Sequence, residues 1–139
     1  MVICMNSRDL EKRIKDFAIR CLQAVDALPR TASGHAISTQ LARCATSVGA
    51  NYRASNRSRS RAEWFAKLCI VIEECDESAY WLEIIVEAQM LPSARINALH
   101  VEAGELLAIF ARARHTAKKT DRGEALTRQV IKSPSRQIS

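Results

Sequence analysis

The side chains that most often carry out catalysis or bind metal ions are scattered along this chain. The histidines, His35, His100 and His115, never stand four residues apart, the spacing that places two imidazoles on one helix face. No Glu-x-x-His pair of the kind found in di-metal bundles occurs, and the four glycines are too dispersed for a phosphate-binding loop. No nucleophile is accompanied by a recognisable base and orienting group. We therefore predict no catalytic residues, no metal site, no cofactor and no enzymatic activity.

The cysteines have an odd count and form no C-x-x-C pair (Cys4, Cys21, Cys44, Cys69 and Cys75). Three of them fall on apolar helix faces, where a free thiol behaves as a small hydrophobic side chain. This pattern predicts free thiols in a reducing compartment, with neither disulfides nor a zinc site. The first residues are too few for a signal-peptide core, and no apolar run is long enough to span a bilayer. We expect a cytoplasmic protein with no membrane partner.

Charge is sorted along the chain, whose net charge is +6 over 139 residues. Residues 43–67 are mostly basic, residues 73–87 carry acids and no base, and residues 112–139 are basic again. A positive charge favours polyanionic partners. The first basic segment supplies six candidate nucleic-acid-binding residues: Arg43, Arg53, Arg57, Arg59, Arg61 and Lys67.

Three of these arginines, Arg57, Arg59 and Arg61, alternate with serines between two predicted helices. A guanidinium group stays charged and binds phosphate through two parallel hydrogen bonds, so the cluster suits contacts with an RNA or DNA backbone. Because no aromatic residues are interleaved, base-specific stacking is not predicted. A solvated turn explains the same composition, and the sequence leaves both interpretations open.

The acidic segment also has two interpretations. Glu73, Asp76, Glu77 and Tyr80 could bind a cation or a basic partner. Alternatively, these acids pair with the preceding helix, since an antiparallel turn near residue 57 brings Arg43 level with Glu73. Long charged side chains beside a bundle seam commonly pair in this way, so we favour interhelical salt bridges.

The elements that position these residues follow from apolar periodicity. Apolar residues recur at spacings of three and four over four segments: residues 7–28, 34–54, 60–90 and 93–118. With 47% hydrophobic residues and few glycines or prolines, the fold class is all-α. The connections are short, so successive helices are antiparallel. We predict an up-down-up-down four-helix bundle over residues 1–118 and a basic, flexible tail over residues 119–139.

Two features exceed what a single bundle requires. The apolar face of the third helix is broad, because Phe65, Ile72, Ala79 and Val86 add a second row beside its core row. The second helix carries a polar stripe next to its apolar face, formed by Gln40, Arg43, Ser47 and Asn51. Such a stripe is solvated, or it faces another helix or subunit.

Two blocks of sequence carry a family resemblance. The first is Thr46-Ser47-Val48-Gly49-Ala50-Asn51-Tyr52-Arg53, followed by Arg59-Ser60-Arg61. The second is Lys67-Leu68 and then Glu73-Glu74-Cys75-Asp76-Glu77-Ser78-Ala79-Tyr80-Trp81-Leu82-Glu83. With Glu102, Glu105, Leu106 and Thr116, these blocks resemble a bacterial four-helix-bundle family over about residues 8–118. Its founding members are encoded within intervening sequences of large-subunit ribosomal RNA genes. Some members carry proline at the position of Gly49 and Glu-Gly at Ala54-Ser55, which indicates a different branch.

The resemblance implies a four-helix bundle that assembles as a homo-oligomer, most often a homopentamer. A related protein, the accessory variability determinant of diversity-generating retroelements, is a basic pentamer that binds nucleic acid and a reverse transcriptase. We predict a non-catalytic, homo-oligomeric nucleic-acid-binding or scaffold module that contacts RNA or DNA phosphates. The alternative is an adaptor that binds another protein and makes no direct contact with nucleic acid.

Overall fold

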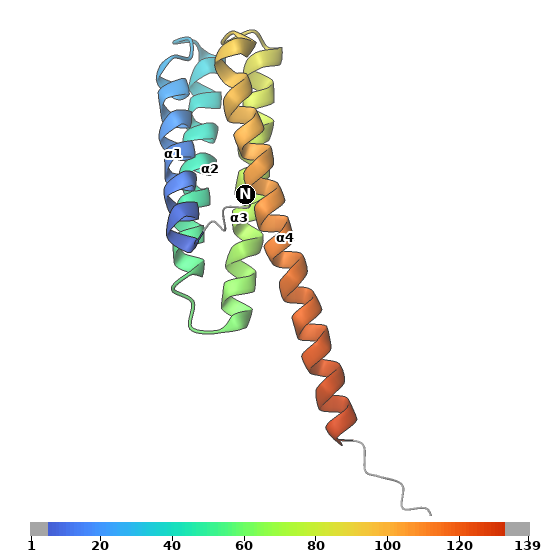
Figure 1. Ribbon diagram of the computed structural model, residues 1–139. Coiled ribbons are helices and arrows are strands. Elements are labelled where there is room, and N and C mark those ends of the chain that lie inside the picture. Colours follow the sequence, from blue (N-terminus) through green and yellow to red (C-terminus); the bar gives the residue numbers. More distant parts are fainter. Residues whose placement is uncertain (1–5, 133–139) are drawn as a thin grey trace, which may run out of the picture.

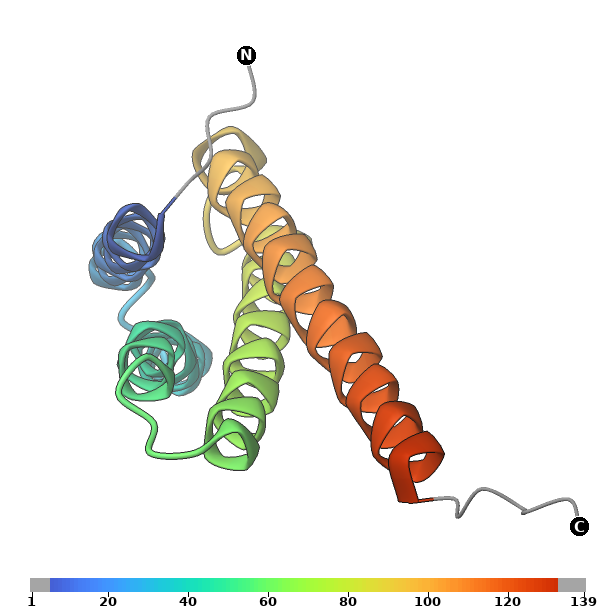
Figure 2. The same cartoon turned by 60° about the horizontal axis from the view of Figure 1, so that its bottom comes forward.

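The computed structural model describes residues 6–132, with side chains for residues 6–129. It contains four α-helices: α1 (Ser7–Asp26), α2 (Ala32–Ser55), α3 (Arg61–Glu87) and α4 (Ser93–Lys132). Successive helices are antiparallel and α3 lies between α2 and α4 (Figure 1 and Figure 2). The predicted all-α, four-helix bundle is confirmed. Cys4 and residues 133–139 of the predicted tail lie outside the described residues.

Side-chain caps fix where α1 and α3 begin. Asn6 and Asp9 form a capping box, in which the Asp9 N–H donates to Asn6 Oδ1 at 2.9 Å. Ser60 caps α3 by accepting from the Glu63 N–H at 3.1 Å. The Glu63 carboxylate accepts from the Arg59 N–H at 3.0 Å. This second bond anchors the backbone of Arg59 to the first turn of α3.

The predicted apolar faces form one continuous core. Buried side chains recur at spacings of three and four on every helix, as in Ile14, Phe17 and Cys21 of α1. The core row of α3 is buried at Leu68, Val71, Cys75, Ser78, Leu82 and Ile85, whereas Trp64, which its spacing also predicts, is only partly buried. Each fully buried leucine, isoleucine or phenylalanine contributes about 1.5–3 kcal/mol, so these rows determine how the helices pack.

Three of the thiols belong to this core. Cys21, Cys44 and Cys75 are buried, and burial raises the pKa of Cys21 and of Cys75 to about 12. Burial also raises the pKa of the Cys44 thiol, whose sulfur accepts a hydrogen bond from the Ser78 hydroxyl at 3.2 Å. Protonated and shielded from water, these thiols serve as packing groups rather than nucleophiles.

Ion pairs join α2 to α3, which confirms the favoured interpretation of the acidic segment. Arg43 pairs with Glu74 at 3.2 Å and also with Glu77. The hydrogen bond to Glu77 is the main reason that the pKa of Arg43 is raised and the pKa of Glu77 is lowered. Glu74 and Glu77 lie one and four residues after Glu73, the residue that the antiparallel register predicts to be level with Arg43.

The connection from α1 to α2 folds tightly over the first turn of α2. Thr31 caps α2 by accepting from the Gly34 N–H at 3.1 Å, so α2 begins at Ala32, two residues before the predicted start. Gly34 is buried, and a Cβ atom there would lie 1.9 Å from the carbonyl oxygen of Pro29. The turn therefore requires the absence of a side chain at this residue.

The prediction that the fourth helix ends near Lys118 is wrong, because α4 continues to Lys132 and passes beyond the bundle (Figure 1). Ala117 is its last buried residue among those described. Apolar periodicity ends there, but helix-forming residues continue and the next proline is Pro134. Local contacts support the extension, including an ion pair between Arg61 and Asp121 at 2.6 Å. The buried face of α4 thus ends before the helix itself ends.

Helix α1 touches α4 less than it touches α2. The main polar link between them is Arg13, whose guanidinium contacts Glu102 and Glu105 at 2.5 Å each. The hydrogen bond to Glu102 is the largest cause of the raised pKa of Arg13. None of the described helices combines the length and apolar character that crossing a membrane requires.

Candidate nucleic-acid interface

Four of the six predicted binding residues gather at one end of the bundle. Arg53 lies in the last turn of α2, Arg57 and Arg59 lie in the α2–α3 connection, and Lys67 lies in the second turn of α3. Together with Ala50, Ala54 and Glu63 they line a shallow hollow of about 450 Å³. We call the four cations Arg53, Arg57, Arg59 and Lys67 the basic end.

The hollow at the basic end carries a net positive charge. None of its four cations makes an ion pair with a described residue. The one acid in the hollow, Glu63, accepts from the Arg59 backbone N–H. Arg53 and Arg57 line the same hollow, and their like charges repel each other. An anion bound between them would relieve that repulsion.

The other two predicted residues are engaged elsewhere. Arg43 lies ten residues before Arg53, about 15 Å along α2, and its charge is neutralised by Glu74 and Glu77. Arg61 is close to the basic end, but it pairs with Asp121 and donates to the Ala117 carbonyl at 3.4 Å. The structure thus separates Arg43 from the site and gives Arg61 a role in attaching α4.

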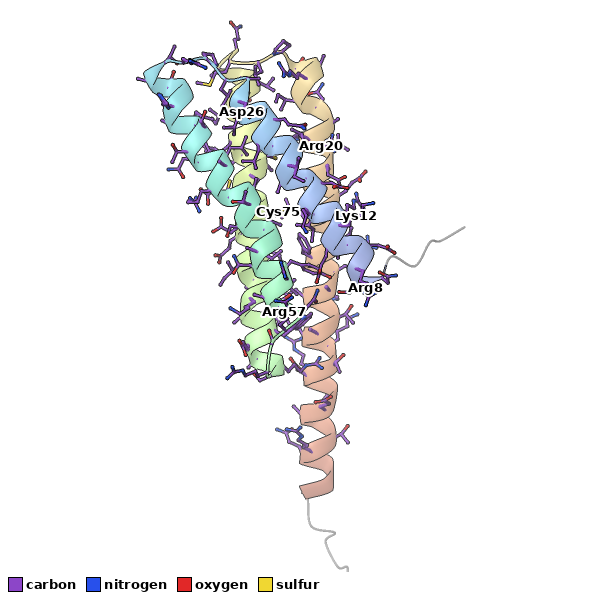
Figure 3. The ribbon with its side chains drawn as sticks, turned by 90° about the vertical axis from the view of Figure 1, so that its left-hand side faces the viewer. Arg8, Lys12, Arg20, Asp26, Arg57 and Cys75 are labelled. Carbon is purple, nitrogen blue, oxygen red and sulfur yellow. The ribbon has the colours of Figure 1, made fainter. Side chains whose placement is uncertain are left out.

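The start of α1 lies beside the basic end. The Asn56 side-chain NH2 donates to Ser7 Oγ at 2.9 Å and to Glu11 Oε1 at 2.8 Å, which ties the start of α1 to the end of α2. Arg8 and Arg57 accordingly lie toward the same end of the bundle (Figure 3). Cations of α1 therefore extend the positive surface beyond the residues that sequence analysis selected.

A second hollow, of about 630 Å³, runs between α1 and α2. We call it the α1–α2 groove; it is lined by Arg8, Glu11, Lys12, Lys15, Ala18, Ile19, Leu22, Thr46, Gly49, Ala50, Arg53 and Arg57. It shares Arg53 and Arg57 with the basic end. Glu11 is its one acid, and none of its five cations makes an ion pair with a described residue.

Sequence analysis missed the groove residues of α1, although a signal was present. Arg8, Lys12, Lys15, Ile19 and Leu22 follow one another at spacings of four, three, four and three. This is the spacing of a single helix face, and here it marks a stripe outside the core.

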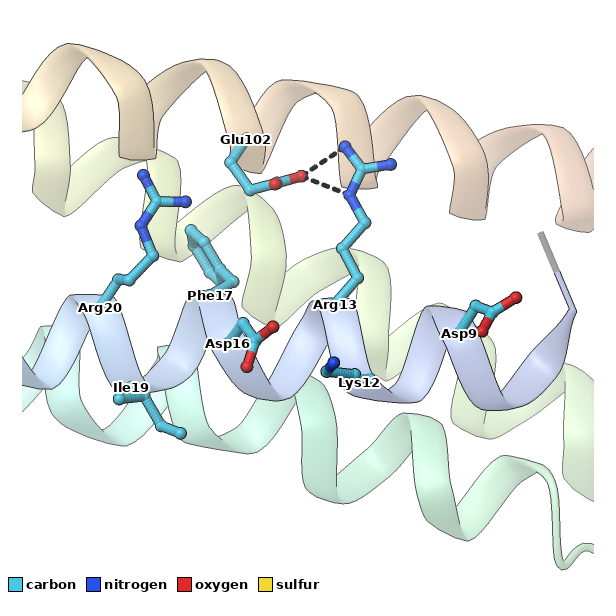
Figure 4. Close-up of a pocket in the computed structure, with 8 residues that line it drawn as sticks. All are labelled: Asp9, Lys12, Arg13, Asp16, Phe17, Ile19, Arg20 and Glu102. Carbon is cyan, nitrogen blue, oxygen red and sulfur yellow. Dashed lines mark hydrogen bonds and ion pairs between the residues drawn. The ribbon is translucent and has the colours of Figure 1, made fainter. Parts of the chain in front are cut away.

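A third hollow, between α1 and α4, has a different electrostatic character (Figure 4). Three acids and three bases line it, so its charges balance: Asp9, Asp16 and Glu102 with Lys12, Arg13 and Arg20. The ion pair between Arg13 and Glu102 crosses it. This hollow offers no net attraction for phosphate. Across residues 6–132, no group of His, Cys, Asp or Glu side chains is arranged to hold a metal ion.

Comparisons with known proteins identify relatives of the chain. The profile of the 23S rRNA-intervening sequence protein family matches residues 8–112. A crystal structure of a protein of unknown function from the S23 ribosomal protein family of Bacteroides thetaiotaomicron is similar, with a TM-score of 0.71 and 25% sequence identity. That similarity covers 76% of this chain and 97% of the other. The comparison with curated proteins gives no match.

Proposed function

Because the chain belongs to the 23S rRNA-intervening sequence protein family, we propose that it is a non-catalytic, homo-oligomeric module that binds RNA or DNA through backbone phosphates. The observation that carries this proposal is the group of unpaired cations at the basic end. Arginine and lysine side chains without internal partners are free to replace the counterions condensed on a nucleic acid. With no aromatic side chain lining the hollow, binding is independent of sequence.

Neutralising two cations that line only the basic end tests the proposal. We expect the double variant Arg59→Gln, Lys67→Gln to bind RNA and DNA more weakly, because two phosphate contacts are lost. The logarithm of the binding constant should also depend less steeply on the logarithm of the salt concentration, by about two units of slope. Gel-shift titrations against single-stranded RNA, single-stranded DNA and duplex DNA at several salt concentrations measure both quantities.

The double variant Arg30→Gln, Arg95→Gln is the matched control. It removes the same charge from exposed residues near the opposite end of the bundle, so the slope should stay at the wild-type value. An equal loss of nucleic-acid affinity in both double variants would show that net charge alone drives binding. It would contradict the assignment of the binding site to the basic end. If the wild-type protein binds none of the three nucleic acids, the adaptor function becomes the better proposal.

Self-assembly is the second part of the proposal, and exposed apolar side chains on α3 support it. Ile70 and Tyr80 are 39% and 52% exposed within a single chain. We expect light scattering to give a mass several times that of one chain, with a pentamer as the favoured number from the family resemblance. Replacing Tyr80 by Glu should lower that mass, because a charge would be buried in the contact. A wild-type protein that is monomeric at all accessible concentrations contradicts self-assembly.

A further inference from the structure

The α1–α2 groove has two halves of different chemistry. The half nearer the start of α1 is mostly cationic: it contains Arg8, Lys12 and Lys15 of α1, Arg53 of α2 and Arg57 of the α2–α3 connection, together with Ala50 and one acid, Glu11. The other half is built from uncharged residues: Ala18, Ile19, Leu22, Thr46 and Gly49. A ligand that fills the whole groove therefore needs negative charge at one end and an apolar surface at the other.

The apolar half is accessible in the folded chain. Ile19 and Leu22 are 47% and 39% exposed and lie one helical turn apart, so together they form an apolar patch. On the facing side, α2 presents only small residues, Thr46 and Gly49. A Cβ atom at Gly49 would be in ordinary contact with the buried Ile14, 3.4 Å from its Cγ2 atom.

Nucleic acid suits only one half of this groove. Phosphates would gain from the cations, but the other half has no aromatic ring on which a base could stack, and its one hydroxyl, that of Thr46, donates to the Ala42 carbonyl of its own helix. A protein helix meets both requirements, because carboxylates and aliphatic side chains can occupy successive turns of one face. The stretch from Arg8 to Leu22 is about 21 Å long, which matches a helix of about four turns.

We propose that the α1–α2 groove binds an amphipathic helix of a partner protein, with acidic side chains over its cationic half and leucine or isoleucine over Ile19 and Leu22. Charge complementarity determines the direction and position of this helix. Burial of Ile19 and Leu22 supplies affinity that persists at high salt, because apolar contacts are not screened. This site extends beyond the nucleic-acid binding proposed above and needs neither Arg59 nor Lys67.

A defined peptide serves as the probe. It is an acetylated, amidated helix of sixteen residues with glutamate on the docking face of its first two turns and leucine on that face of its last two turns. Alanine and glutamine fill the other positions, and a fluorophore reports binding by anisotropy. Two control peptides replace either the glutamates by glutamine or the leucines by alanine. We expect the parent peptide to bind and both control peptides to bind at least tenfold more weakly.

Variants of the full-length protein locate the peptide. The double variant Ile19→Asn, Leu22→Asn should reduce affinity about tenfold or more, because it removes the aliphatic surface. Val101→Asn is the matched control, since Val101 is an exposed aliphatic residue of α4 outside the groove. Neutralising Lys12 and Lys15 should weaken binding and flatten its salt dependence, whereas neutralising Lys118 and Lys119 should not. Circular dichroism verifies that each variant is folded.

Three outcomes overturn the proposal. The first is unchanged peptide affinity in the folded Ile19→Asn, Leu22→Asn variant. The second is a change in subunit number in that variant, which would identify the groove as an interface between copies of this chain. The third is a loss of RNA or DNA affinity as large as the loss of peptide affinity, which would assign the whole groove to nucleic acid. Because Arg59 and Lys67 lie outside the groove, nucleic-acid binding and peptide binding can fail independently.

Discussion

Replacing Gly34 by alanine should destabilise the protein by about 3 kcal/mol, near the upper end of the typical cost of overpacking. The added Cβ atom would lie 1.9 Å from the Pro29 carbonyl oxygen and 3.2 Å from Thr31 Oγ1. The first contact is with backbone, so rotation of a side chain cannot relieve it. The connection from α1 to α2 would have to move, and the Thr31 cap of α2 would be weakened with it. Urea unfolding followed by circular dichroism, at one fixed protein concentration, measures the change.

Gly104→Ala is the control for this substitution. Gly104 is exposed in α4, and a Cβ atom there would meet nothing within 4 Å. Alanine has the higher helix propensity, so this variant should gain up to about 1 kcal/mol of stability. The opposite signs separate the steric clash at Gly34 from the general effect of glycine in a helix. A Gly34→Ala variant as stable as Gly104→Ala would contradict the close approach of Gly34 to the Pro29 carbonyl oxygen in the α1–α2 connection.

The second large effect is expected at Phe110, where replacement by alanine should cost about 4 kcal/mol. Phe110 is only 1% exposed, and its ring lies 5.8 Å from that of Tyr52, centroid to centroid, at a tilt of 38°. Truncation removes a large buried side chain and leaves a cavity between α4 and the C-terminal half of α2. Differential scanning calorimetry should record a correspondingly lower melting temperature.

Val101→Ala provides the comparison on the same helix. Val101 is 58% exposed, so its truncation should change the free energy of unfolding by less than about 0.5 kcal/mol. Phe110 contacts Tyr52, which directly precedes Arg53 of the basic end. The Phe110→Ala variant should therefore also bind RNA less tightly than the wild-type protein, even at a low temperature at which both are folded. If Phe110→Ala loses as little stability as Val101→Ala, the packing of Phe110 in α4 against Tyr52 in α2 is contradicted.

The fold was largely predictable because local signals and packing agree over most of the chain. The apolar rows of all four helices and the pairing of Arg43 with acids of α3 follow from side-chain spacing. The end of α4 did not follow from the sequence, because helix propensity and apolar periodicity diverge after Ala117. Periodicity reports where a helix is buried, and propensity reports where it can continue.

The candidate site was only partly predictable for a related reason. Arg53, Arg57, Arg59 and Lys67 are close in the sequence, and their proximity in space needs only the α2–α3 connection. The contribution of Arg8, Lys12 and Lys15 depends on how α1 packs against α2, which charge patterning within one segment does not report. Likewise, the ion pair of Arg61 with Asp121 depends on the extension of α4 beyond the bundle, which the sequence pattern did not predict.

Arg53 and Arg57 border both the basic end and the α1–α2 groove. A ligand bound in either hollow therefore interacts with two positive charges that also attract a ligand in the other hollow. Two ligands that depend on the same pair of guanidinium groups are thermodynamically linked, and each must weaken the other by the same factor. The two shared arginines would thus make the two ligands displace each other. A protein helix that docks on α1 and α2 promotes release of nucleic acid, and nucleic acid in excess promotes release of the helix.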